Sequence, residues 1–244
     1  MTERNICIVL TCTIDVCGVA FTERSDIETR HKDYQIALRK WLKNRYVGRI
    51  VVVENSGYDL AALKQIVAEE KSGKQVEFIS FFGQDFPRHL GKGYGEAQAL
   101  ARVASDSRLL GSSGSFIKIN GRYYVPNAHR FLEQLNPDVD VMTNLSKGLT
   151  WSDSRVFGGS SKFLKDYLCP EGRRVDDSAS FFFEHALACA THRAIADGLN
   201  WVLLPCTPHI DGMSGTANSL YKQSWLRTVA RDIFLRVKAA IIFR

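Results

Sequence analysis

The stretches NICIVLTCT (residues 5–13) and RIVVVENSG (residues 49–57) decide the fold of this chain. Each is an apolar run, rich in β-branched residues, that ends in small polar side chains. Such a run is typical of a strand that is buried on both faces and opens into a loop. QVEFISF (75–81) is expected to be a third strand and SFIKING (115–121) a fourth, buried one, so we expect four strands in the first half of the chain.

Segments with helical periodicity separate these strands. Apolar residues recur at helical spacing in segments 26–43, 60–70 and 95–108, and Asp59 is a plausible cap for the second of them. Alternation of strands and helices predicts right-handed crossovers and an α/β fold with a single open, mostly parallel sheet flanked by helices. Ligands of such sheets bind beyond the carboxyl ends of the strands. The polar residues at those ends are Thr11, Thr13, Glu54, Asn55, Ser56 and residues 120–123.

The second half of the chain is less regular. DVDVMTN (138–144), LTWSDSRVFG (149–158) and WVLLPC (201–206) are expected to be strands. Segments 162–168 and 179–197 are expected to be helices, and the pattern after residue 218 is helical as well. We therefore expect an α/β domain over residues 1–217 and a basic amphipathic helix over residues 218–244.

The positive charge of the chain is concentrated at its end. The 244 residues carry a net charge of +6, of which residues 222–244 hold +5 and the first 221 residues only +1. A nucleic-acid-binding face would need cations across the body of the fold, so this class of function is not expected. Residues 222–244 instead predict a helix that binds a peripheral membrane surface, or one that docks on the core or on a second subunit.

The sequence shows no pattern typical of a signal peptide or of a membrane-spanning segment. The N-terminal segment has neither a basic region nor an apolar region of signal-peptide length, and no apolar run approaches the roughly 20 residues of a membrane span. The six cysteines show no Cys-x-x-Cys motif and no paired metal-ligand spacing. We expect a cytoplasmic protein.

Two segments could meet a phosphate. Gly91, Gly93 and Gly95 precede the third predicted helix, where backbone amides can approach an anion, although a flexible turn would explain them equally well. Lys118 and Arg122 stand at the end of the fourth predicted strand, and arginine can neutralise a diphosphate with a bidentate fork. The alternative for these cations is a turn with solvated charges.

Two further segments carry candidate catalytic groups. Asp153 and Arg155 are expected on the same side of a strand, where they could clamp sugar hydroxyls or hold each other. Glu184 lies beside three phenylalanines, which could desolvate its carboxylate and suit it to act as a general base. Alternatively, Asp177 is only a helix cap and Glu184 faces water.

Two remaining motifs receive weaker interpretations. The small-residue loop 208–218, which contains Ser214 and Gly215, is either a lid that orders over a substrate or a plain surface loop. Asp138 and Asp140 form an Asp-x-Asp pair at the start of a predicted strand, which is the wrong end for a ligand site. We therefore expect no metal ion there.

Taken together, these segments resemble a glycosyltransferase of the A-type fold. In that superfamily the first strand and its loop hold the nucleotide base, here VLTCTID (9–15), and the second strand ends near the base, here VVVENSG (51–57). A glycine-containing helix start follows, here GKGYGEAQAL (91–100). Where the family carries a metal-binding Asp-x-Asp, this chain has Asn120-Gly121-Arg122. The resemblance therefore implies that Arg122 and Lys118 replace a divalent metal, so that no cofactor is expected.

The chain is also similar to glycosyltransferases of bacterial capsule and lipopolysaccharide assembly. The similar segments are KINGRY (118–123), DSRVF (153–157) and FEH (183–185). The resemblance implies a nucleotide-sugar donor and a surface-polysaccharide, lipopolysaccharide or lipid-linked acceptor. It implies three sets of site residues, namely catalytic Glu184, Asp153 and Arg155; nucleotide-sugar-binding Thr11, Thr13, Glu54, Asn55, Ser56, Lys92, Gly93, Glu96, Lys118, Asn120, Arg122 and Tyr123; and acceptor or lid residues His185, Ser214 and Gly215.

Two other functions remain open at this point. A nucleotidyltransferase or sugar-nucleotide-modifying enzyme could use a similar sheet, and it would release no nucleotide in response to an acceptor. A non-catalytic nucleotide- or glycan-binding module would be stabilised by its ligand but would never turn it over.

Overall fold

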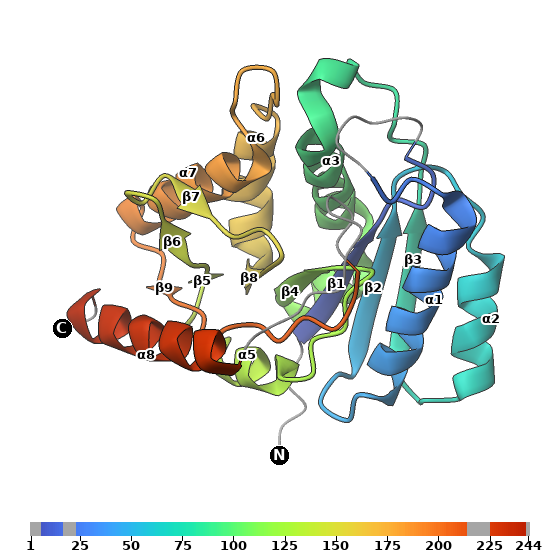
Figure 1. Ribbon diagram of the computed structural model, residues 1–244, viewed down its shortest axis with the longest axis horizontal. Coiled ribbons are helices and arrows are strands. Elements are labelled where there is room, and N and C mark those ends of the chain that lie inside the picture. The colour runs from blue at the N-terminus through green and yellow to red at the C-terminus, as the bar shows by residue number, and fades with distance from the viewer. Residues whose placement is uncertain (1–5, 17–22, 214–224, 243–244) are drawn as a thin grey trace.

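The computed structural model describes residues 6–16, 23–213 and 225–242 (Figure 1). These residues form a seven-stranded sheet with the strand order β3-β2-β1-β4-β8-β5-β9. Its strands are β1 (Ile6–Cys12), β2 (Arg49–Glu54), β3 (Gln75–Ser80), β4 (Ser115–Asn120), β5 (Val141–Met142), β8 (Val156–Ser160) and β9 (Trp201–Val202). A separate small hairpin consists of β6 (Leu145–Ser146) and β7 (Trp151–Ser152).

The sheet is mostly parallel, as the sequence predicts. Strands β1, β2, β3 and β4 run parallel to one another, and β9 runs parallel to β5. Strand β8 is the exception, because it runs antiparallel to both β4 and β5. The strands of the first half therefore end at the same edge of the sheet.

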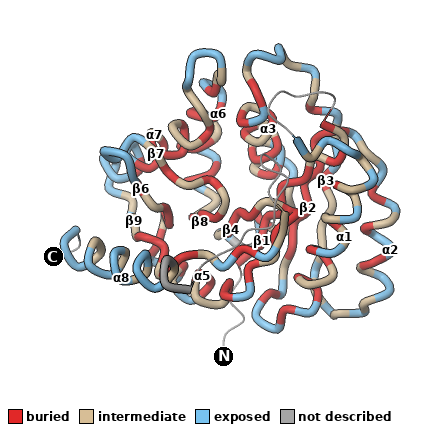
Figure 2. Tube along the Cα trace, in the orientation of Figure 1, coloured by how far each residue is buried: buried red, intermediate tan, exposed pale blue. Residues whose placement is uncertain are grey.

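Helices cover both faces of the sheet and bury its two sets of alternating side chains. One face packs on α1 (Ile27–Lys43), α2 (Ala61–Glu70) and α5 (Ala128–Gln134). The other packs on α3 (Gly91–Asp106), α4 (Arg108–Ser113), the π-helical turn η2 (Phe163–Leu168) and α7 (Phe183–Ala196). The short helices η1 (Arg88–Leu90) and α6 (Cys169–Gly172) precede α3 and follow η2. Figure 2 shows buried residues running through the strands between these layers.

Several predicted elements of the second half are shorter than expected. Segment 138–144 contributes only Val141 and Met142, and segment 149–158 is divided into β7 and β8 by a bend at residues 153–155. The prediction that Asp153 and Arg155 share a strand is therefore wrong. Helix α7 begins at Phe183 rather than at residue 179, because a turn closed by the pairing of Asp176 with Phe181 precedes it. Helix α3, by contrast, begins four residues earlier than predicted, at Gly91.

The C-terminal helix is confirmed as α8 (Trp225–Ile242). The predicted domain boundary at residues 217 and 218 lies outside the described residues. No helix in the described part of the chain is both long and apolar enough to cross a bilayer.

Candidate active site

A cavity of about 630 Å³ opens where β1, β2 and β4 end. Its walls come from the loops after these strands, from α1 and α3, and from the segments around β7 and the start of α7. Twelve predicted site residues line it, namely Thr11, Thr13, Asn55, Lys92, Gly93, Glu96, Lys118, Asn120, Arg122, Tyr123, Arg155 and Glu184. Glu54, Ser56, Asp153 and His185 are not among the lining residues, and Ser214 and Gly215 lie outside the described part of the chain.

Glu54 and Ser56 support the cavity from behind its wall. The Glu54 carboxylate is fully buried and accepts hydrogen bonds from the backbone amides of Ile14 at 3.1 Å and Tyr58 at 3.0 Å, and from both the amide and the hydroxyl of Ser56. The Ser56 hydroxyl accepts the amide of Asp15 at 3.1 Å. The two residues fasten the loop after β1 to the end of β2, and neither lines the cavity in which we expected them to contact a nucleotide.

The loop after β1 is also held by two α1 residues that sequence reasoning missed. The Arg30 guanidinium donates to the carbonyl oxygens of Thr13 at 2.8 Å and Ile14 at 3.2 Å, and the Tyr34 hydroxyl accepts the Thr13 amide at 2.9 Å. Arg30 and Tyr34 continue, at four-residue spacing, the buried stripe of α1 that includes Leu38. This four-residue spacing could have identified Arg30 and Tyr34 from the sequence, because polar residues on a buried helix face need hydrogen-bond partners.

Asn55 connects this loop to the start of α3. Its amide oxygen accepts the Thr13 hydroxyl at 2.6 Å, and its amide nitrogen donates to the Gly95 carbonyl at 2.9 Å. A Cβ atom on Gly95 would stand 3.3 Å from that nitrogen, and one on Gly91 would stand 1.8 Å from the Asp177 carboxylate. The glycines lie within α3 rather than before it, where they let neighbouring side chains approach the helix backbone.

Arg122 occupies the turn after β4 and is only 7% exposed. Its Nη1 donates to the Met213 carbonyl at 3.2 Å, while its Nε has no hydrogen-bond partner among residues 6–16, 23–213 and 225–242. No carboxylate among the described residues forms an ion pair with it. A Cβ atom on Gly121 would collide with the Cys12 Sγ atom at 2.5 Å, so this tight turn requires glycine. The cavity wall therefore contains a buried cation that, within the part of the chain that the structure describes, has the Tyr123 ring at 5.8 Å and no carboxylate as a partner.

Lys118 has a different environment, although it also lines the cavity. Its side chain is 1% exposed, and its ammonium forms an ion pair with Glu96 of α3 and donates to the Ser154 carbonyl at 2.8 Å. The charge predicted for a diphosphate is therefore neutralised within the protein. Glu96, predicted as a ligand contact, is its counter-charge.

Two carboxylates face the cavity from the α7 side. Glu184 Oε1 accepts the Ser154 hydroxyl at 2.8 Å, so this carboxylate is oriented by the bend before β8. Burial raises the pKa of Asp177, with the positive charge of Lys92 opposing the shift and the negative charge of Glu184 adding to it. The structure thus brings together an acidic pair, of which sequence analysis favoured Glu184.

Asp153 and Arg155 form an ion pair with each other. The sequence left open whether they would do so or would clamp sugar hydroxyls. The Arg155 Nε atom donates to both Asp153 carboxylate oxygens, at 2.9 and 3.0 Å. Burial alone would raise the pKa of Asp153, but hydrogen bonds and the charge of Arg155 outweigh it and hold that pKa below its usual value. Of this pair, Arg155 reaches the cavity.

His185 belongs to the start of α7 rather than to the cavity wall. Its Nδ1 accepts the backbone amide of Phe182 at 3.1 Å, which caps the helix. Its ring stacks on Phe181 and Phe182 and meets the edge of Trp151. The structure gives it a capping position and no cavity contact.

The residues after β4 do not fit a divalent metal. Asn120, Gly121 and Arg122 supply an amide, no side chain and a guanidinium, and a guanidinium has no lone pair to donate to a cation. The Asp-x-Asp pair lies elsewhere, at the start of β5, where the Asp140 carboxylate accepts the Asn200 amide at 3.0 Å. Within residues 6–16, 23–213 and 225–242, no three His, Cys, Asp or Glu side chains cluster as a metal site.

This chain is similar to known proteins in structure and matches none of them in sequence. No family model matches the chain, and no curated protein matches its sequence. The glycosyltransferase GlyE of Streptococcus pneumoniae TIGR4 superposes with a TM-score of 0.52 at 9% identity, covering 81% of this chain and 44% of GlyE. This chain therefore spans less than half the length of that protein.

Two other solved structures superpose less well. Core-mannan synthase A of Aspergillus fumigatus, in an Mn/GDP form, has a TM-score of 0.47 at 9% identity over 90% of this chain and 78% of its own. The 4-diphosphocytidyl-2C-methyl-D-erythritol synthase of Anaerococcus prevotii has 0.43 at 11% identity over 96% and 97%. Of the three structures, GlyE alone exceeds a TM-score of 0.5, and at 9% identity its similarity to this chain is one of fold alone. With its mostly parallel sheet and its cavity beyond the strand ends, the chain has a fold like that of the A-type glycosyltransferases.

Proposed function

We propose that the chain is a glycosyltransferase that moves a sugar from a nucleotide-sugar donor to an acceptor hydroxyl. The observation that carries this proposal is Arg122, a cation buried in the cavity wall with an unused Nε donor and no ion-pair partner among the described residues. A buried charge without a partner costs several kcal/mol. An anionic ligand that enters the cavity would offset this cost.

A diphosphate fits this cation for geometric reasons. The guanidinium fork can donate two parallel hydrogen bonds to phosphate oxygens, and a low-dielectric cavity strengthens them. Arg122 stands beyond the carboxyl end of β4, beside Asn120, in the zone where open α/β sheets bind ligands. The monophosphate of a CMP-activated sugar would use the same contact.

The proposed chemistry assigns one role to each charged group. The acceptor oxygen attacks the anomeric carbon of the donor, and the bond from that carbon to the phosphate oxygen breaks with both electrons going to phosphate. Arg122 stabilises the negative charge that develops on the leaving phosphate. In an inverting transfer Glu184 takes the proton from the acceptor hydroxyl, and Ser154 orients its carboxylate. Asp153 holds Arg155 against the cavity, where Arg155 positions a sugar.

The proposed reaction needs no divalent metal. The supporting observation is the donor set after β4, in which a guanidinium stands at the place of a ligand carboxylate. Transfer should therefore continue in excess EDTA, and strict dependence on added Mn²⁺ or Mg²⁺ would overturn this part of the proposal.

For the acceptor we propose a polysaccharide, lipopolysaccharide or lipid-linked glycan of a bacterial surface. The sequence segments 118–123, 153–157 and 183–185 support this class of acceptor. Such glycans are assembled from cytoplasmic nucleotide-sugars, so we expect the protein at the inner face of the plasma membrane.

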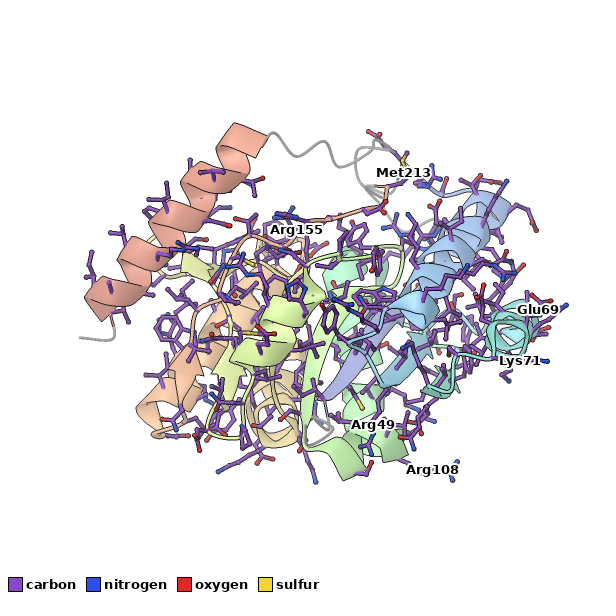
Figure 3. The ribbon with its side chains drawn as sticks, turned by 90° about the horizontal axis from the view of Figure 1, so that it is seen from below. Arg49, Glu69, Lys71, Arg108, Arg155 and Met213 are labelled. Carbon is purple, nitrogen blue, oxygen red and sulfur yellow. The ribbon has the colours of Figure 1, made fainter. Side chains whose placement is uncertain are left out.

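The test is nucleotide release from a panel of UDP-, GDP-, dTDP- and CMP-sugars, with and without glycan acceptors. We expect acceptor-stimulated release from one donor, and at least a tenfold loss for Arg122→Gln, in line with a lost charge-assisted hydrogen bond of about 1.5–3 kcal/mol. Arg49→Gln is the matched control, because Arg49 lies at the opposite, amino end of β2 (Figure 3). Nucleotide-sugar synthesis from a sugar phosphate and a nucleoside triphosphate would instead indicate a nucleotidyltransferase. Ligand binding without turnover would indicate a binding module.

A further inference from the structure

Helix α8 contacts the rest of the protein through its more polar side. The Asp232 carboxylate accepts the Thr207 amide at 2.7 Å, and the Lys238 ammonium donates to the Leu145 carbonyl. Burial lowers the pKa of Lys238. Thr228, Leu235 and Ala239, which share this side at helical spacing, are partly buried, so this is the side of α8 that packs on the body.

The opposite side of α8 is apolar and exposed. Ile233, Phe234, Val237 and Ile241 are 57%, 66%, 52% and 72% exposed. At 100° per residue these four positions fall across the helix from the packed side. We name them the outer face of α8.

This orientation reverses the usual arrangement of an amphipathic helix. The apolar stripe of a surface helix normally faces the core, because burial of apolar area is what holds the helix in place. In α8 an aspartate faces the body while a phenylalanine faces away, and Figure 2 shows residues 228–242 of α8 as exposed or partly exposed. A contiguous exposed apolar stripe of this kind marks an interaction surface.

The charges beside the outer face indicate its partner. Arg231 and Arg236 are exposed and fall on opposite borders of the apolar stripe. Asp232 is the sole acidic residue of α8, and it is engaged on the packed side. A second copy of the helix would therefore bring cations near cations without offering a carboxylate, whereas anionic headgroups would complement both borders.

We propose that the outer face of α8 binds the surface of an anionic lipid bilayer, with Arg231 and Arg236 among the headgroups. The helix would lie in the plane of the interface, since it is not apolar enough to cross. Figure 3 shows α8 on the same side of the molecule as Arg155, which lines the cavity, and Met213, which accepts from Arg122. If the proposed function holds, this placement brings the cavity to a lipid-linked acceptor.

Vesicle sedimentation of the full chain tests this proposal. We expect binding to vesicles of phosphatidylcholine with phosphatidylglycerol, and much weaker binding to phosphatidylcholine alone. Val237→Asp with Ile241→Asp should lower partitioning at least about tenfold, because two charges enter the apolar stripe. Arg231→Gln with Arg236→Gln should lower it about fivefold for each cation, on the anionic vesicles only.

The matched control is Ile36→Asp with Ile195→Asp, two exposed isoleucines of α1 and α7 that are 47% and 38% exposed. This variant should bind vesicles as the parent does, and circular dichroism with thermal unfolding checks that all variants fold. Vesicle binding that Val237→Asp with Ile241→Asp leaves unchanged, or no binding at all, would overturn the proposal. So would a dimer, seen by light scattering, that this variant dissociates. The readout needs no donor or turnover, so it stands or falls separately from the proposed function.

Discussion

Replacing Glu96 by glutamine should destabilise the fold, because it removes the counter-charge of Lys118. Strand β4 lies between β1 and β8, and Lys118 is opposite Val9 and Phe157 in the register of these neighbours. Its side chain is almost completely buried, and besides Glu96 its ammonium contacts the Ser154 carbonyl at 2.8 Å and lies 5.7 Å from the centre of the Phe157 ring. Glutamine preserves the shape of Glu96 but leaves the ammonium charged and unpaired.

The size of the effect follows from the burial of the two partners. Breaking a buried ion pair by removing one partner costs about 3–5 kcal/mol. The Glu96 side chain is 23% exposed, so water can solvate the altered site in part, and we expect about 3 kcal/mol. For a chain of this length each kcal/mol shifts the Tm by about 2–4 °C, which gives a fall of roughly 6–12 °C.

Urea unfolding of Glu96→Gln, Lys118→Met and the double variant measures this effect. Lys118→Met should be milder than Glu96→Gln, because it leaves a carboxylate that water can reach rather than a buried ammonium. The double variant should recover part of the loss. The reasoning is refuted if Glu96→Gln unfolds within 1 kcal/mol of the parent while Lys118→Met weakens nucleotide binding, since Lys118 would then be a ligand cation.

Three further outcomes are expected. Glu184→Gln should lower kcat by about 10²–10⁴ with little change in KM for the donor, and a larger kcat loss for Asp177→Asn in the same assay would move the base role to Asp177. Because Arg155 holds the pKa of Asp153 below its unfolded value, their pair should stabilise the fold at neutral pH by about 0.2–1 kcal/mol and lose this contribution as the pH falls below about 4. Urea unfolding between pH 7 and pH 3 checks this, and Asp153→Asn should flatten the profile. Gly121→Ala should cost about 1–3 kcal/mol in urea unfolding, because its Cβ has no room beside Cys12.

The first half of the fold could be predicted because its signals are local. Strands β1, β2 and β4 are largely apolar, buried runs that end near polar residues, and α1 carries a periodic buried stripe. These features depend on neighbours in the sequence. The edge of the sheet that holds the cavity followed directly from them, since parallel strands end together.

The roles of individual charges could not be predicted, because their partners are distant in sequence. From the sequence, Lys118 is expected to bind an anionic ligand. Its ion pair with Glu96 of α3 becomes visible only in the folded chain. From the sequence, Glu54 is expected to contact the nucleotide base. In the structure its carboxylate instead accepts a backbone amide of the loop after β1. A polar residue at a strand end can face either the cavity or a neighbouring loop, and only the packing of that loop decides which.

The orientation of helix α8 on the rest of the protein could not be predicted from the sequence either. The periodicity of residues 225–242 predicts an amphipathic helix, and the structure confirms that a helix forms there. It does not say which side meets the body, and a hydrophobic core would normally take the apolar one. The contacts of Asp232 and Lys238 reverse that expectation.

The binding of nucleoside diphosphates to the parent chain and to Arg122→Gln, measured by calorimetry in excess EDTA, tests the central claim most directly. The claim predicts that the parent binds at least one of UDP, GDP and dTDP, or CMP, without metal, and that Arg122→Gln weakens this binding by about 10- to 100-fold. Arg49→Gln should bind as the parent does. Equal affinity of the parent and Arg122→Gln, or binding by the parent only after Mn²⁺ is added, would contradict it.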